Sequence, residues 1–280
     1  MANLAVGVLH PGEMGISVAA CAQKSGHTVY WASQDRSTQT RARADHFNLL
    51  DAGTLAQLCN TCTVLVSVCP PHAAEQVADQ VLAQGYSGLY IDANAVSPER
   101  AKRIGQAMEA GGAAFVDGGI IGGPAWQPRR TWMYLSGKSA AEVPALFSAG
   151  PLETQVIGDE IGQASALKMC YAAYTKGSTA LLCTILATAE TLGVRADLEQ
   201  QWSRGGSDFA VQTENRVRRV TAKAWRFAGE MEEIAATFEQ AGLPGGFHAA
   251  AAEIYQRMAG FKDAPATPEL DEVMTALLDG

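Results

Sequence analysis

The sequence predicts an α/β protein: a Rossmann-type domain, followed by an all-α domain that a long interdomain helix joins to it. Two observations support this fold class. In the first half, short apolar runs alternate with helical patterns, and the first run ends in a glycine-containing turn. In the second half no strand pattern recurs after an uninterrupted helical stretch over 162–193, which is roughly 45 Å long if fully helical. We place the domains at residues 1–161 and 162–280.

Charge and composition limit the partners that we expect. The 280 residues are 48% hydrophobic and 18% charged, and the formal net charge is −8. Such an acidic chain has little general affinity for nucleic acid or anionic membranes, so we expect a small-molecule substrate. One basic stripe with helical spacing is better explained as a solvated face or a subunit contact than as a phosphate track. It consists of Arg216, Arg219, Lys223 and Arg226.

Targeting, membrane and metal signals are missing from the pattern. The chain enters an apolar strand without a basic leader, and the uncharged run of the long helical stretch, 177–189, is shorter than the ~18 apolar residues of a membrane span. Cys59 and Cys62 form a CxxC pair, but neither a second pair nor a nearby histidine completes a zinc site. We therefore expect reduced thiols, no metal site and a cytoplasmic protein.

A glycine turn follows the first expected strand, 3–9. A helical pattern over 16–24 and a second strand over 28–32 complete a strand–turn–helix–strand unit of the nucleotide-binding type. Such a turn directs backbone N–H groups and a helix N-terminus at a pyrophosphate. The candidate cofactor-binding residues of the turn are His10, Pro11, Gly12, Glu13, Met14 and Gly15. Two glycines fit the GxGxxG pattern, and His10 occupies the position of the first one.

The residues after the second strand indicate which dinucleotide is preferred. An NAD site usually has an acidic residue there that binds both ribose hydroxyls. This chain has Ser33, Arg36 and Ser37, whose guanidinium and hydroxyls suit a 2′-phosphate. Asp35 is the residue that favours NAD. The hydroxyls can also start a helix that runs through Phe47, and a helix cap is compatible with a phosphate site. We favour NADP.

Three further strands are expected to end in ligand-facing loops. They span 63–68, 88–92 and 114–117, and after them come Cys69, Pro70 and Pro71, then Asn94, then a glycine-rich loop over 118–124. The first three residues are candidate cofactor contacts, and Asn94 is a candidate for both cofactor and substrate. The backbone of Gly122 and Gly123 is a candidate for the substrate, because glycine lets a ligand approach closely. Runs over 131–135 and 154–157 are expected to add strands.

The helix over 162–193 places a lysine and three hydroxyls on one face. These residues recur at three- and four-residue intervals and are Lys168, Tyr171, Thr175 and Thr179. A lysine there is either an ordinary surface charge or the working group of the protein, and spacing alone favours the surface. A face of small residues allows close packing of a second helix and consists of Ala166, Cys170, Ala173 and Gly177.

Taken in order, these segments resemble the β-hydroxyacid dehydrogenase family, which includes 6-phosphogluconate and 3-hydroxyisobutyrate dehydrogenases. The family's GxGxxMG-type, LPxxxxV, IDxSTxxP and DxxxSGG segments correspond to residues 10–15, 69–77, 91–98 and 117–123. Its catalytic lysine lies near the start of a long interdomain helix in a GxxxKxxxN setting, which is the position of Lys168. The resemblance covers essentially the whole chain. It is strongest to a less-characterised branch with a phosphogluconate-dehydrogenase-like carboxyl-terminal domain.

The chain departs from the family pattern mainly in the substrate pocket. Asn94 and Ala95 replace Ser-Thr, Ile121 replaces a substrate-binding serine, and Tyr171 stands near the usual asparagine. The resemblance implies a dinucleotide-binding first domain, with Lys168 as general base in oxidation and general acid in reduction. Tyr171 departs from the family, and from its place one turn beyond Lys168 we expect it to orient the substrate oxygen. The resemblance also implies a homodimer formed through the helical domain, in which the partner chain completes the active site.

The sequence thus predicts an NADP(H)-dependent oxidoreductase that transfers a hydride between the nicotinamide and a hydroxyl-bearing carbon. Imine reductases share this architecture but commonly have a different proton donor at the lysine position. Lys168 favours alcohol chemistry, and Tyr171 keeps the imine alternative open. A nucleotide-sensing protein without turnover is a third interpretation, which the retained lysine disfavours.

Overall fold

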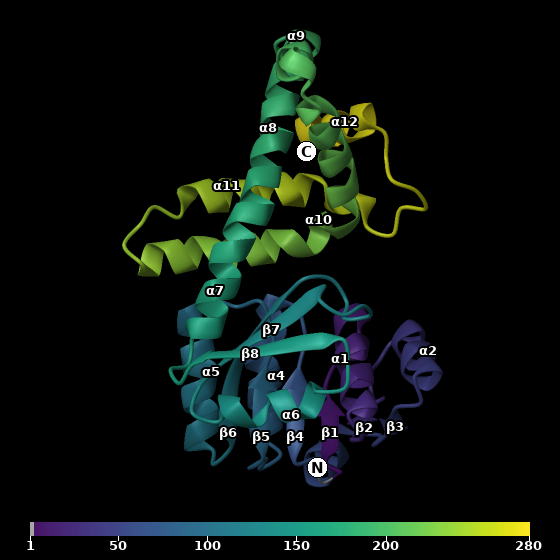
Figure 1. Cartoon of the computed structure of the whole chain (residues 1–280), viewed down its shortest axis with the longest axis vertical. Coiled ribbons are helices and arrows are strands. Elements are labelled where there is room, and N and C mark those ends of the chain that lie inside the picture. Colours follow the sequence, from purple (N-terminus) through teal and green to yellow (C-terminus); the bar gives the residue numbers. More distant parts are fainter. Residues whose placement is uncertain (1–2) are drawn as a thin grey trace. The chain divides into compact units, whose positions relative to one another are not determined.

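A computed structural model describes residues 3–280, so residues 1–2 of the expected first domain lie outside the described residues. The chain forms two compact units, one that ends at Met169 and one from Cys170 to Gly280 (Figure 1). The division falls inside helix α7 (Gln163–Ala172). The expected boundary after residue 161, and the roles given to the two domains, stay predictions.

The first unit is built on a mostly parallel sheet, which has eight strands within the described residues (Figure 1). The strand order is β3-β2-β1-β4-β5-β6-β7-β8, and β6 pairs with β7 in the antiparallel direction. The strands are β1 (Ala5–Val8), β2 (Thr28–Trp31), β3 (Leu50–Asp51), β4 (Val64–Ser67), β5 (Leu89–Asp92), β6 (Ala114–Ile121), β7 (Thr131–Ser136) and β8 (Leu152–Gly158). The Rossmann-type fold predicted from the alternating pattern is confirmed.

Helices cover both faces of this sheet, because successive side chains of a strand point to opposite faces. Val64 and Val66 of β4 belong to one apolar core, and Leu65 belongs to the other. The first core includes α1 (Glu13–Lys24), α2 (Thr38–His46) and α6 (Pro144–Phe147), and the second includes α3 (Leu55–Thr61), α4 (Ala74–Leu82) and α5 (Pro98–Ala110). Every residue of β4 and β5 is buried, which explains their continuous apolar runs.

One expected loop is part of a strand. We predicted that the strand starting at 114 ends at Asp117 and that a loop spans 118–124, but β6 continues to Ile121. The extension pairs with β7, which places Gly118 opposite Leu135 and Ile121 opposite Trp132. Strand pairing overrides the weak strand preference of glycine, so the predicted end was wrong. β3 was not predicted, because two exposed residues carry no alternating pattern.

The long helix predicted over 162–193 is confirmed, because residues 163–191 are helical throughout. It contains a π-helical turn, Ala173–Gly177, that the pattern did not indicate. Within the second unit, the carbonyl oxygen of Thr175 accepts a 2.7 Å hydrogen bond from Arg216, and that of Lys176 accepts a 2.8 Å bond from the hydroxyl of Tyr255. Side chains of other helices thus satisfy carbonyls that the wider turn leaves accessible, which the chain order alone does not reveal.

The second unit is helical throughout its regular structure (Figure 1). Its helices are α8 (Ser178–Thr191), α9 (Arg195–Trp202), α10 (Phe209–Gln240), α11 (Gly246–Arg257) and α12 (Leu270–Asp279). α10 buries a stripe that includes Val217, Ala224 and Met231, at helical spacing. α11 lies alongside α10, where the rings of Phe227 and Tyr255 meet edge to face at 5.5 Å. In the described part of the chain, every helix is too short or too polar to cross a bilayer.

Candidate active site

The carboxyl ends of β1, β4 and β5 lie at one edge of the sheet, and the segments singled out in the sequence begin there. β6 runs parallel to β5 and places Asp117 opposite Asp92, the last residue of β5. The rest of β6 therefore extends past this edge. The topology gathers the glycine turn, the segments after β4 and β5, and the end of β6 on the same side of the first unit.

The glycine turn depends on Gly15 and is open at Gly12. A Cβ on Gly15 would lie 2.1 Å from the carbonyl oxygen of His10, so only glycine allows α1 to approach β1 this closely. A Cβ on Gly12 would meet no atom within 4 Å, so open space lies in front of this residue. Gly12 is the N-cap of α1, and no side chain caps the first turn. Uncapped backbone N–H groups therefore lie next to open space.

These features fit the pyrophosphate of a dinucleotide. The N-terminus of α1, a helix of 12 residues, favours negative charge, and its free N–H groups are the donors that a pyrophosphate requires. Of the remaining turn residues, Pro11 is buried and Met14 is partly buried. The carboxylate of Glu13 is exposed, so water screens its repulsion of an anion.

His10 and Arg36 lie together at the start of the turn. Arg36 Nη2 donates a 3.4 Å hydrogen bond to the carbonyl oxygen of Leu9. Within the described structure, Arg36 Nε and His10 Nδ1 are buried without hydrogen-bond partners. Burial, and then the charge of Arg36, lowers the pKa of His10 to about 4, so the imidazole is neutral at pH 7. Unsatisfied polar groups beside a glycine turn suit a polar ligand.

Ser33 and Ser37 differ in how they hold the loop after β2. The Ser37 hydroxyl accepts a 3.2 Å hydrogen bond from the N–H of Thr40, so it caps α2 as predicted. Ser33 is buried, its N–H donates to Asp51 at 3.2 Å, and its carbonyl accepts from Arg41 at 2.6 Å. The backbone of Ser33 is therefore bound inside the protein, whereas Ser37 is exposed.

Two arginines that the sequence pattern did not single out lie beside Arg36. Arg41 Nε donates a 3.3 Å bond to the carbonyl oxygen of Arg36, and Arg43 Nη1 donates a 3.3 Å bond to that of Pro11 in the glycine turn. Both arginines lie on α2. The helix predicted to run through residue 47 is therefore the sequence feature that could have indicated them. Asp35 adopts a φ of 59°, a conformation that aspartate tolerates in turns. A cluster of guanidinium groups thus borders the turn.

Asn94 connects the ends of β4 and β5. It is buried, its amide nitrogen donates a 3.0 Å hydrogen bond to the hydroxyl of Ser67, and its amide oxygen accepts a 2.5 Å bond from the N–H of Cys69. Both ends of the amide are thus bonded inside the protein. Burial raises the pKa of the Cys69 thiol to about 12, so the thiol is neutral. After it, Pro70 is exposed and Pro71 is buried.

Asp92 is a buried carboxyl group at the same edge. Its Oδ1 accepts a 2.9 Å hydrogen bond from the N–H of Asn94, whereas Oδ2 has no partner within the described structure. Burial is the main cause that raises the pKa of Asp92 to about 7. The hydrogen bonds from Asn94 oppose this rise, and the charge of Asp117 adds to it. Asp92 thus titrates near neutral pH.

Asp117 fastens the start of α7 to the sheet. Its Oδ2 accepts hydrogen bonds from the N–H groups of Gly162 at 2.9 Å and Ser165 at 3.0 Å, and its Oδ1 accepts a 2.6 Å bond from the Ser165 hydroxyl. The Ser136 hydroxyl donates to Oδ2 at 2.9 Å and accepts from the N–H of Ala164 at 3.0 Å. A carboxylate on a neighbouring strand thus does what an N-cap residue usually does.

Gly119 of β6 lets α7 lie directly against the sheet. A Cβ at this position would be 2.6 Å from the carbonyl oxygen of Ala164 and 3.0 Å from Cβ of Lys168. Lys168 is partly buried, and its backbone lies beside the extension of β6. The contact between Gly119 and α7 therefore brings Lys168 to the part of the sheet that extends past the end of β5.

The Gly122–Gly123 turn follows β6 and leads over α1. Gly122 has a φ of 123°, and a Cβ there would lie 2.4 Å from the carbonyl oxygen of Arg130, so this position requires glycine. A Cβ on Gly123 would meet no atom within 4 Å. Further along, the N–H of Ala125 donates a 2.9 Å hydrogen bond to the hydroxyl of Ser17 on α1. The turn therefore approaches the helix that begins at the glycine turn.

Tyr171 lies one turn beyond Lys168 on α7 and is 49% exposed. The two threonines expected on the same face make internal hydrogen bonds. The hydroxyl of Thr175 donates to the carbonyl oxygen of Tyr171 at 3.2 Å, and that of Thr179 accepts a 2.6 Å bond from Arg216. The expected face is therefore not a row of free hydroxyls.

The fold and the site define a class of protein. A doubly wound sheet, a glycine turn at its first strand–helix junction and arginines after β2 are typical of dinucleotide-binding Rossmann proteins. Among residues 3–280, no group of three or more His, Cys, Asp or Glu side chains is arranged to hold a metal ion.

Comparison with known proteins identifies the family. Residues 5–146 match the NAD-binding domain of 6-phosphogluconate dehydrogenase, and residues 189–258 match DUF1932, a domain of unknown function. The chain belongs to the family that this NAD-binding domain defines, so the resemblance to the β-hydroxyacid and 6-phosphogluconate dehydrogenases is confirmed. Membership supports a dinucleotide-dependent oxidoreductase.

Similar proteins agree with this assignment. An uncharacterized 28.5 kDa protein of Methanothermus fervidus is 32% identical over 164 residues, which span 58% of this chain and 62% of that protein. A solved protein of unknown function, described as structurally similar to 3-hydroxyacid dehydrogenases, is 27% identical with a TM-score of 0.68, and the match covers 92% of this chain and 97% of that one. Mycobacterium tuberculosis 3-hydroxyisobutyrate dehydrogenase, solved with L-serine, shares the fold at 18% identity and a TM-score of 0.71, over 99% of both chains.

Proposed function

We propose that the chain is an NADP(H)-dependent dehydrogenase or reductase that acts on CH–OH groups, with Lys168 as the general acid and base. The observation that carries this proposal is the attachment of α7 to β6. Asp117 holds the first turn of α7, and Gly119 leaves no side chain between β6 and Lys168. A surface lysine needs no such attachment, so the arrangement favours a catalytic role for Lys168.

The reaction requires a group that accepts a proton in one direction and donates it in the other, and a lysine amine can do both. In oxidation, the substrate hydroxyl gives its proton to Lys168 Nζ while the carbon loses a hydride, and in reduction the ammonium returns a proton to the carbonyl oxygen. A lysine with its ordinary pKa of about 10.4 is protonated at pH 7, which suits reduction. Oxidation requires the neutral amine, which can accept the proton of the substrate hydroxyl.

The first unit has the residues to hold NADP. The bound cofactor supplies the nicotinamide carbon that accepts or donates the hydride. The backbone at Gly12 and the start of α1 would hold the pyrophosphate, and Arg36 and Ser37 would bind the 2′-phosphate, with Arg41 close by. His10 is the neutral group in this cluster, and its unpartnered nitrogen is available to a ligand.

Substrate contacts are proposed for two groups, and a shaping role is proposed for Asn94. The Gly122–Gly123 backbone has open space at Gly123, and Tyr171 has an exposed ring on the helix of Lys168. Asn94 is proposed to fix the turn at Cys69, and so to shape the site, because both ends of its amide are bonded internally. Tyr171 would orient the substrate oxygen.

An imine reductase is the second candidate. Tyr171 favours it, since a half-exposed phenol one turn from Lys168 is an additional proton donor. A nucleotide-sensing protein is a weaker alternative, because sensing requires neither a lysine nor its attachment to the sheet.

We further propose a homodimer whose partner chain completes the active site, and a cytoplasmic location. In the second unit, Tyr171, Tyr174 and Leu181 are 49%, 74% and 44% exposed, which suits burial against a second copy. The small face expected to form this contact is partly used within the chain, because a Cβ on Gly177 would lie 3.3 Å from Phe247. The larger exposed side chains, rather than Gly177, are thus proposed to meet the partner.

A paired activity screen tests the proposed reaction. Reduction of NADP and of NAD would be followed with a panel of hydroxyacids and alcohols, and oxidation of NADPH with the matching ketones, with and without an amine. We expect turnover with NADP and a hydroxyl compound, and less with NAD. Turnover that requires the amine would favour the imine reductase. Cofactor binding without turnover across the panel would contradict both enzymatic proposals.

A further inference from the structure

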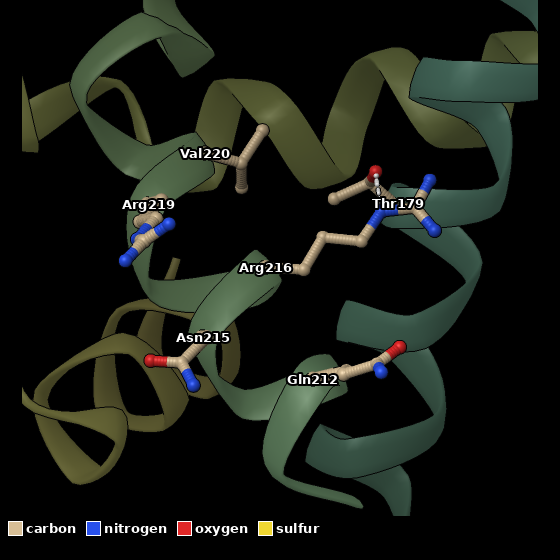
Figure 2. A pocket seen from close by; sticks show the side chains of 6 residues that line it. All are labelled: Thr179, Gln212, Asn215, Arg216, Arg219 and Val220. Atoms are coloured by element: carbon tan, nitrogen blue, oxygen red, sulfur yellow. Dashed lines mark hydrogen bonds between the residues drawn. The ribbon is translucent and has the colours of Figure 1, made fainter. Parts of the chain in front are cut away.

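The second unit contains a pocket that the proposed reaction does not use. We propose that it binds a small organic oxyanion, a carboxylate or phosphate that also carries hydroxyl groups. The cavity is about 580 Å³, within the usual range for small-molecule sites. Its lining residues come from α8 and α10 and are Thr179, Gln212, Asn215, Arg216, Arg219 and Val220 (Figure 2). Arginines and amides make this lining cationic and rich in hydrogen-bond donors.

Arg216 is fixed in place before any ligand binds. Its side chain extends from α10 toward α8, where Nε donates a 2.6 Å hydrogen bond to the hydroxyl of Thr179 (Figure 2). Nη2 donates to the hydroxyl of Ser178 at 2.6 Å and to the carbonyl oxygen of Thr175 at 2.7 Å. All of these acceptors are neutral, so they orient the guanidinium and leave its charge uncompensated. In the described part of the chain, Nη1 makes no hydrogen bond and remains available to an anion.

Two neighbouring cations, Arg218 and Lys176, are neutralised, but those of the pocket are not. Arg218, between the two pocket arginines, has Glu214 at 3.4 Å and Glu269 at 2.9 Å. Lys176 pairs with Glu230 at 2.7 Å. Arg216 and Arg219, by contrast, form no salt bridge within residues 3–280. In a chain with a net charge of −8, this pairing pattern leaves a local positive charge at the cavity.

The lining indicates the class of ligand. A guanidinium presents parallel N–H donors that match a carboxylate or phosphate. Asn215 donates one N–H to the carbonyl oxygen of Val211 at 2.9 Å, and Gln212 donates one to Asp208 at 2.6 Å. Each amide therefore retains an oxygen and a second N–H, which suit the hydroxyl groups of a ligand. A cavity of this size also holds more than a single inorganic ion.

Calorimetric titration with citrate tests the proposal. Citrate is a hydroxylated carboxylate, and glycerol is a hydroxylated probe without charge. We expect the wild-type protein to bind citrate and not glycerol, and Arg219→Gln to weaken citrate binding about tenfold, the usual effect of losing a charged hydrogen bond. Arg219 is exposed and makes no bond to another helix in the described structure, so this variant should fold normally.

Two controls separate this pocket from other sources of binding. Arg226→Gln removes the same charge from the same helix outside the lining, and Arg36→Gln removes a candidate phosphate contact in the first unit. Both variants should bind citrate within about twofold of the wild type. An equal loss in all three variants would indicate general charge attraction and overturn the proposal. Loss with Arg36→Gln alone, or no citrate binding up to about 10 mM, would overturn it as well. None of these binding measurements depends on Lys168. A negative result for the pocket can therefore be distinguished from a failure of the proposed reaction.

Discussion

The carboxylate of Asp117 on β6 accepts a 2.6 Å hydrogen bond from the hydroxyl of Ser165 on α7. Lys168 lies three residues further along the same helix, which is one turn. Because the backbone N–H groups of Gly162 and Ser165 bind the same carboxylate, the first turn of α7 cannot shift without breaking several hydrogen bonds together. Ser165 therefore links the proposed working lysine to the sheet.

Removal of the Ser165 hydroxyl should reduce turnover more than cofactor binding. Ser165→Ala loses one of the bonds to Asp117 and should cost about 1–2 kcal/mol in the free energy of unfolding. If this bond positions Lys168, kcat should fall about tenfold, while the Kd for NADP changes by less than about twofold. Urea denaturation and steady-state kinetics measure the two effects. Ser165→Thr, which retains the hydroxyl, should recover most of kcat, and failure to do so would argue for a purely structural role.

Loss of the lysine amine should abolish proton transfer. Lys168→Ala should lower kcat by about 10²–10⁴-fold, the usual contribution of a general acid or base. Binding of NADP, followed by fluorescence quenching, should stay nearly unchanged. Lys102→Ala is a matched control, because Lys102 is an exposed lysine paired with Glu99 at 2.8 Å. Near-normal turnover of Lys168→Ala would remove Lys168 from the mechanism.

Arg36 should decide between the two dinucleotides. Arg36→Gln removes the guanidinium next to the glycine turn, so the Kd for NADP should rise about ten- to a hundredfold. The Kd for NAD should change little, since NAD has no 2′-phosphate. Parallel titrations of both cofactors measure the ratio, with the surface variant Arg103→Gln as control, because Arg103 pairs with Glu75 at 2.9 Å on the surface. An equal loss for NADP and NAD would contradict a 2′-phosphate contact.

The glycines of the turn should respond differently to the same added methyl group. Gly15→Ala places a Cβ 2.1 Å from the carbonyl oxygen of His10, so it should destabilise the protein by at least about 2 kcal/mol and lower its Tm. Gly12→Ala meets no atom within 4 Å, so its Tm should be unchanged. Its Cβ would fill the space proposed for the pyrophosphate, and NADP should bind at least about tenfold more weakly. Thermal melts and cofactor titration distinguish these effects, and normal NADP binding by Gly12→Ala would contradict the proposed cradle.

Asp92 should make the protein less stable as the pH rises. Its pKa is raised from 3.8 to about 7 in the folded state. The unfolded state therefore ionises first, and stability is lost progressively from about pH 4 until the folded-state carboxyl ionises near pH 7. Asp92→Asn keeps an acceptor for the N–H of Asn94 and cannot ionise. Its free energy of unfolding relative to wild type should therefore rise by up to about 4 kcal/mol between pH 4 and 8. Parallel urea titrations at these pH values measure the difference, and a constant difference would contradict the assignment.

The sequence pattern predicted most of the fold because the relevant interactions are local or periodic. Apolar runs predicted most of the strands, and the absence of a recurring strand pattern in the second half predicted its all-α structure. The extension of β6 through Gly118 and Gly119 was missed, since antiparallel pairing with β7 is a long-range interaction that glycine does not signal. The π-helical turn was missed for a similar reason, because Arg216 and Tyr255 come from distant helices.

The sequence alone determined the fold class, the glycine turn, the position of Lys168 on a helix and the arginine after β2. Each of these depends on residues close together in the chain, where spacing and residue type are sufficient. Only the tertiary structure decided that Asp117 holds the helix of Lys168, that Asn94 is bonded internally and that Arg216 and Arg219 border a pocket. These relationships join segments far apart in the chain, and hydrogen bonding and close packing between such segments have no periodic signature in the sequence.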